Sequence, residues 1–167
     1  MSYPAAAIAN SFLDLARAHG KRLTPMQIQK LVYFAHGWHL AYEESPLSEE
    51  QAQAWRWGPV FPTLYHAVKL WGREPIERDV IAFRLIREDG HHRVEKSVPR
   101  VIDGVHTAFL ETIWDAYGEM SGPALSSLSH DIDGPWYRVW HESGGAHGVI
   151  IPDELIQEYF GERLKAA

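Results

Sequence analysis

Residues 53–66 have the sequence QAWRWGPVFPTLYH, in which two tryptophans flank an arginine and a Gly-Pro pair precedes a second proline. Polar and apolar residues alternate over residues 51–57, a pattern typical of a short strand. Gly58 and Pro59 favour a corner that ends this strand, and residues 61–71 have the spacing of a helix. This amount of aromatic surface around one rigid corner is typical both of a packed core and of a binding surface.

Helices are predicted on the N-terminal side of this corner. Residues 5–19 are rich in alanine, with larger apolar residues at helical spacing. A second helix begins at Thr24, because Thr24 and Gln27 form a capping-box pattern and Pro25 suits the first helical position. Apolar residues recur every three to four positions as far as Tyr42, so one face of this helix is expected to be buried.

After the corner, the spacing of apolar residues changes from helical to alternating. Alternation from Val80 to Arg87, a turn at Asp89-Gly90 and a second extended run from Arg93 to Val98 predict a β-hairpin. Helical spacing returns over residues 102–116, and a last helix opens at Pro152. The sequence therefore predicts one compact domain over residues 1–167, mainly α (α+β), with a small antiparallel sheet or hairpin.

Composition and charge narrow the class of protein. The 167 residues are 46% hydrophobic and 23% charged, as in folded globular domains. No cysteine is present, which excludes disulfides and thiolate metal sites and fits a reducing cytoplasm, so we expect a cytoplasmic protein. The net charge is -6 and no block of Lys or Arg occurs, so direct nucleic-acid binding is not expected. No apolar run is long enough to span a bilayer.

The ten histidines raise the question of a metal site. His36 and His39 lie three residues apart on a predicted helix, but no nearby carboxylate completes a ligand set, so both are expected to be packing or surface residues. His130, Asp131 and Asp133 combine groups that bind metals or transfer protons, although the Asp-Gly-Pro sequence there is also typical of a turn. No nucleophile elbow or phosphate-binding loop is present, and we predict no catalytic residue, no metal and no cofactor.

Three blocks of sequence together resemble the Panacea domain, the family of SocA-like antitoxins and phage-associated GepA-like proteins. The blocks are MQIQKLVYFAHGWHLA (residues 26–41), AWRWGPVFPTLYHAVK (residues 54–69) and LSSLSHDIDGPWYRVW (residues 125–140). Their order and spacing match the family pattern, which runs from Q-K-L-x-Y through A-W-x-x-G-P-V to L-S-x-x-S-H and G-P-W. Family members often have threonine before the histidine, where this chain has Ser129.

The resemblance implies a non-enzymatic antitoxin that neutralises a cognate protein toxin by direct contact. The SocA-like branch also implies a proteolytic adaptor that hands its toxin to the ClpXP protease, which is then a second expected partner. Two other classes stay open. One is a small metal-dependent hydrolase that uses His130, Asp131 and Asp133, and the other is a phage-related regulatory protein, which the net charge disfavours.

The motif residues divide into two expected roles. Trp57, His130 and Trp136 are expected at the surface that binds the partner, Trp136 because it follows a Gly-Pro turn and not a periodic apolar run. The others are expected to hold the fold around the corner: Gln29, Lys30, Trp55, Gly58, Pro59, Tyr65, Gly134 and Pro135.

Overall fold

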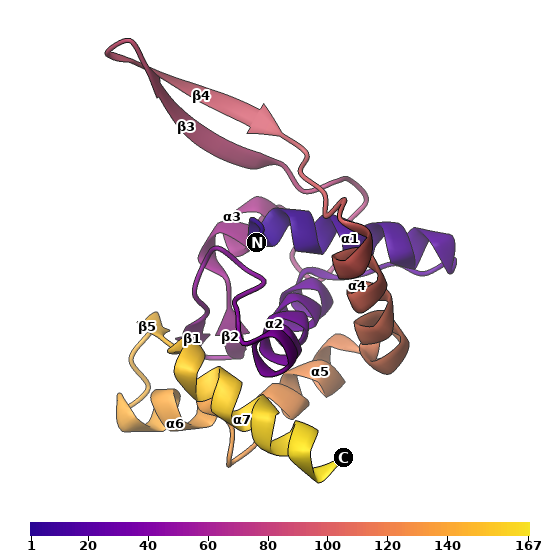
Figure 1. Ribbon diagram of the computed structural model, residues 1–167, viewed down its shortest axis with the longest axis vertical. Coiled ribbons are helices and arrows are strands. Elements are labelled where there is room, and N and C mark those ends of the chain that lie inside the picture. Colours follow the sequence, from indigo (N-terminus) through magenta and orange to yellow (C-terminus); the bar gives the residue numbers. More distant parts are fainter.

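A computed structural model describes all residues, 1–167, and consists of packed helices with a small antiparallel sheet beside them and a projecting β-hairpin (Figure 1). This confirms the mainly α (α+β) class. The helices are α1 (Ala5–Ala18), α2 (Pro25–Glu43), α3 (Pro62–Val68), a 3-10 turn η1 (Lys69–Trp71), α4 (Gly104–Tyr117), α5 (Gly122–Ser129), α6 (Pro135–Glu142) and α7 (Asp153–Ala166). None of these helices has the length and apolar character needed to cross a bilayer.

The strands form two separate antiparallel units. β1 (Gln53–Trp55) lies between β2 (Gly58–Val60) and β5 (Val149–Ile150) in the first sheet. The second consists of β3 (Ala82–Glu88) and β4 (His91–Ser97). The first sheet joins segments almost a hundred residues apart in the chain, whereas the second pairs neighbours across one tight turn.

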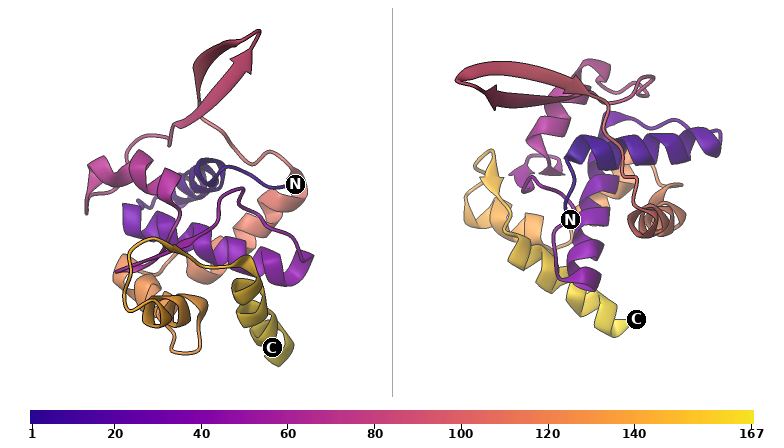
Figure 2. Two further views of the ribbon diagram at one scale, coloured as in Figure 1. Left: turned by 90° about the vertical axis from the view of Figure 1, so that its left-hand side faces the viewer. Right: turned by 45° about the horizontal axis from the view of Figure 1, so that its top comes forward.

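Helix α2 is the centre of the fold. Helices α1, α4, α5 and α7 surround it, as the two turned views make clear (Figure 2). The predicted start is confirmed: Thr24 and Gln27 form both hydrogen bonds of a capping box, and Pro25 is the first helical residue. The prediction of a single buried face is wrong, because every residue from Ile28 to Gly37 is buried. A helix that is enclosed on all sides has no polar stripe to mark its outside.

Both histidines of the predicted α2 pair are packed inside. His36 Nε2 lies 2.9 Å from an Asp153 carboxylate oxygen, and His36 Nδ1 accepts from the backbone N–H of Ser48 at 3.2 Å. His39 Nδ1 lies 2.7 Å from the backbone oxygen of Ser45. These contacts fasten the neighbouring loop and the start of α7 to α2.

The predicted hairpin is confirmed, and it projects from the body of the molecule (Figure 1). Its base is held by Asn10, which is fully buried in α1. The Asn10 amide donates to the backbone oxygens of Val80 and Pro99 at 2.9 and 3.0 Å, and it accepts from the Val80 N–H at 2.7 Å. One side chain thus closes the loop from which the hairpin extends.

The corner in residues 53–66 differs from its prediction. β1 ends at Trp55, the turn consists of Arg56 and Trp57, and Gly58 and Pro59 belong to the returning strand β2. The expected strand over residues 51–57 is therefore a three-residue strand followed by a two-residue turn. Residues 121–142, for which the sequence predicted no helix boundaries, form α5 and α6.

Candidate functional site

The backbone of the β1–β2 hairpin is clamped by buried side chains from three helices. The indole N–H of Trp136 in α6 donates to the Trp55 oxygen at 2.7 Å. The Ser126 hydroxyl in α5 donates to the Trp57 oxygen at 2.9 Å. Because a buried carbonyl without a partner costs roughly 1–3 kcal/mol, these donors fix the hairpin in one position.

Helix α2 supplies the other two clamps. Lys30 Nζ donates to the Pro59 oxygen at 3.1 Å. The Gln29 amide accepts from the Phe61 N–H at 3.0 Å and donates to the Phe61 oxygen at 3.2 Å. The three sequence blocks of the family pattern therefore meet in space around one hairpin, and Gln29 and Lys30 lie where fold-holding residues were expected.

Gly58 allows the close approach on which this clamp depends. Its φ is +116°, a conformation that favours glycine. A Cβ atom there would lie 2.8 Å from both Lys30 Cε and Ser129 Oγ. Any other residue at this position would displace the Lys30 or the Ser129 side chain.

Lys30 is a charged residue type in an uncommon place, because its side chain is 2% exposed. It has one hydrogen-bond acceptor, the Pro59 oxygen, and no ion pair. Burial lowers the pKa of Lys30 to about 7. The residue that holds the hairpin is thus partly uncharged near neutral pH.

Trp57 stands at the tip of the clamped hairpin and is 60% exposed. The Arg56 guanidinium lies over its ring, 4.9 Å from the centroid. The backbone carbonyl of Trp57 is fixed by Ser126 while its indole faces outward. Trp57 therefore has the exposure that was expected of a partner-binding residue.

His130 lies at the end of α5, behind Trp57. Its ring stacks on Trp136 with the centroids 3.9 Å apart. Burial, reinforced by the nearby charge of Lys30, lowers the pKa of His130, which favours the neutral imidazole at pH 7. The His130 Nε2 atom is buried and has no hydrogen-bond partner.

Trp136 differs from its expected place at the surface. The ring is 5% exposed and belongs to the main hydrophobic core, and it stacks with both His130 and Trp140. Its indole N–H is used by the clamp on Trp55. The expectation of an exposed Trp136 is therefore wrong, because the Gly-Pro pair before it starts a helix whose first turn points into the core.

The other motif residues surround the hairpin. Trp55 is half-buried and packs edge-on against Tyr65, with the ring centroids 4.6 Å apart. Pro59 is buried in β2, and Gly134 and Pro135 are buried at the start of α6. Each of these contacts is compatible with a role in holding the fold.

The three residues of the rival metal hypothesis do not converge. One Asp131 oxygen accepts from the Tyr159 hydroxyl and from Arg163, each at 2.7 Å, and the other accepts from the Asp133 N–H at 3.2 Å. Asp131 is thus engaged in joining the end of α5 to α7, while His130 faces Trp136. No group of three His, Asp or Glu side chains in the chain is arranged to hold a metal ion.

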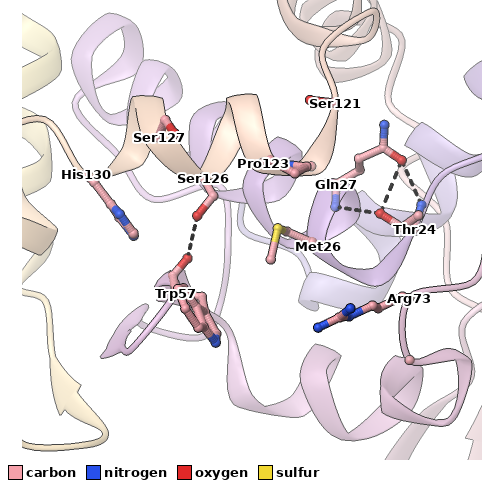
Figure 3. Close-up of a pocket in the computed structure, with 12 residues that line it drawn as sticks. Thr24, Met26, Gln27, Trp57, Arg73, Ser121, Pro123, Ser126, Ser127 and His130 are labelled. Atoms are coloured by element: carbon pink, nitrogen blue, oxygen red, sulfur yellow. Dashed lines mark hydrogen bonds between the residues drawn. The ribbon is translucent and has the colours of Figure 1, made fainter.

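A groove of about 900 Å³ opens beside Trp57 (Figure 3). Helix α5 with its capping residues Ser121 and His130 forms one side, and Trp57 and Arg73 lie on the opposite side, with Met26 between them. We call it the Trp57 groove. Sequence analysis missed Arg73, since a lone arginine in a polar loop carries no local signal, whereas Ser126 could have been found from its place in the L-S-x-x-S-H block.

The family model for the antitoxin SocA-like, Panacea domain matches residues 28–137, and the chain belongs to this family. The match begins one residue before Gln29 and ends one residue after Trp136, so it contains every clamp described above. The chain is also similar to the Antitoxin SocA of Caulobacter vibrioides (strain NA1000 / CB15N). The two are 34% identical over 164 residues, which cover 95% of this chain and 83% of that protein. No solved structure matches the chain.

Proposed function

We propose that this protein is an antitoxin that neutralises a cognate protein toxin by direct binding, with Trp57 as the central contact. The observation that carries the proposal is the combination of exposure and rigidity at this residue. Trp57 is 60% exposed, yet four buried side chains fix the hairpin that presents it.

Rigid exposed aromatics are effective binding residues for a physical reason. A tryptophan that is already held in place loses little conformational entropy when a partner covers it, and its large ring buries much apolar surface. A residue kept in the same place only for folding would be expected to turn its ring inward, as Trp136 does. The membership of the antitoxin SocA-like family supports a protein toxin as the partner.

Co-expression with the toxin encoded in the adjacent reading frame tests this proposal. We expect Trp57→Ala to weaken toxin binding by about thirtyfold, since truncating a central interface tryptophan costs about 2 kcal/mol or more. Rescue of growth should fall in parallel, while the melting temperature stays near that of the wild type. Tyr42→Ala is the matched control, because Tyr42 is 58% exposed and lies at the C-terminal end of α2, outside the Trp57 groove. Equal rescue by both variants would place the toxin contact elsewhere.

Delivery of the bound toxin to the ClpXP protease is a further part of the proposal and rests on the resemblance to SocA-like adaptors. With purified ClpXP and ATP, we expect the toxin to be degraded when this protein is present and to persist when it is left out. Toxin that stays intact in a complex with the protein would limit the function to neutralisation by binding.

A further inference from the structure

We propose that the Trp57 groove binds a toxin segment in which a carboxylate side chain lies next to a large apolar one. This inference rests on the proposed function, and it specifies the chemistry that the site recognises. The charge of the groove and its apolar lining support it independently.

The charge of the groove is opposite to that of the molecule. The chain has 22 acidic and 16 basic residues, yet no acidic residue lines the groove. Its one charged lining residue is Arg73, which is exposed and takes part in no ion pair. An unpaired guanidinium group at the opening is suited to bind a carboxylate.

The polar side chains at the back of the groove are engaged within the chain. The side chain of Gln27 is bonded to Thr24 and to the Met120 oxygen, and Ser126 donates to the Trp57 oxygen. His130 Nε2 is buried and out of reach of a bound segment. Arg73 is therefore the charged group that is left for such a segment.

The apolar part of the groove suits a large apolar side chain of a bound segment. Met26, Pro123 and the exposed Trp57 ring supply apolar surface, and the space of about 900 Å³ is open to solvent along α5. An apolar side chain of the segment would lie on Met26 and Trp57, with its acidic neighbour directed toward Arg73.

A first experiment needs no toxin. Short capped peptides that alternate leucine with glutamate, or leucine with lysine, are added at millimolar concentration to the ¹⁵N-labelled protein. We expect the glutamate peptide to shift the indole N–H resonance of Trp57 and the amide resonances of residues 121–130, and the lysine peptide to leave them unchanged. Arg73→Glu should reverse this preference. Equal shifts with both peptides, or none with either, would overturn the inference.

A second experiment uses the toxin and separates the two proposals. We expect Arg73→Glu to raise the Kd for the toxin by about tenfold or more, because a charge-assisted contact is lost. Arg78→Glu is the control, since Arg78 is exposed, unpaired and outside the groove. If the wild type fails to bind the toxin, the proposed function fails. If it binds and Arg73→Glu binds equally well, only the inference about the groove fails.

Discussion

At the scale of single residues, the Trp136 indole donates a hydrogen bond to the Trp55 oxygen, which lies 81 positions away in the chain. This contact accompanies the burial of Trp136, while Trp57 stays exposed, although both were expected to be exposed. No local pattern reports such a contact. Lys30 is a similar case, because a lysine in a sequence is normally taken to face solvent.

The burial of Lys30 gives a prediction with a definite pH dependence. Its pKa is about 7 in the folded protein and 10.5 for an unperturbed lysine. Between these values the unfolded chain binds more protons than the folded one, so this residue's contribution to the free energy of unfolding rises with pH. Below pH 7 both states carry the charge and the full cost of burying it applies. Above 10.5 that cost has vanished.

Lys30→Met removes the titrating group and isolates this effect. We expect the stability of the variant relative to the wild type to fall between pH 7 and pH 10, by up to about 1.4 kcal/mol for each pH unit. Urea unfolding at several pH values in this range measures the difference. Lys69→Met, at an exposed position, controls for the loss of one positive charge. A difference that stays constant with pH would mean that Lys30 remains hydrated in solution.

At the scale of elements, the predictions were correct where local chemistry decides the structure. The capping box at Thr24 and the Asp-Gly turn between β3 and β4 depend on neighbours in the sequence, and both are confirmed. The turn in residues 53–66 was misplaced because Gly-Pro is typical of a corner. Here Gly58 is required for another reason, since the Lys30 and Ser129 side chains lie too close to it for a Cβ atom.

Gly58→Ala tests whether this close approach holds the hairpin. We expect a loss of about 2 kcal/mol or more in the free energy of unfolding, from backbone strain and from displacement of Lys30 or Ser129. Gly20→Ala is the matched control: Gly20 also has a positive φ, +66°, but a Cβ there meets nothing within 4 Å. Thermal melts of the two variants separate packing from backbone strain. Equal losses would show that strain alone accounts for the effect at Gly58.

At the scale of the whole molecule, the chain consists of one packed body and one projecting hairpin. In the body, 35 buried apolar residues form a single cluster, whereas Ile81, Phe83, Leu85 and Val94 on the hairpin are 43% to 68% exposed. A two-stranded hairpin on its own is at best marginally stable in water. The body therefore supplies the stability, and Asn10 joins the two parts.

Replacement of residues 81–98 by a short glycine-serine linker tests this division. Val80 and Pro99 bond to the same Asn10 amide, so the cut ends lie close enough for such a linker. We expect the shortened protein to melt within a few degrees of the wild type, because it loses mainly exposed side chains. Asn10→Ala in the full chain should instead cost about 2 kcal/mol or more, since it leaves the buried Val80 and Pro99 groups without their partner. If the shortened protein unfolds as readily as Asn10→Ala, the β3–β4 hairpin contributes to the stability of the body, and the two parts fold as one unit.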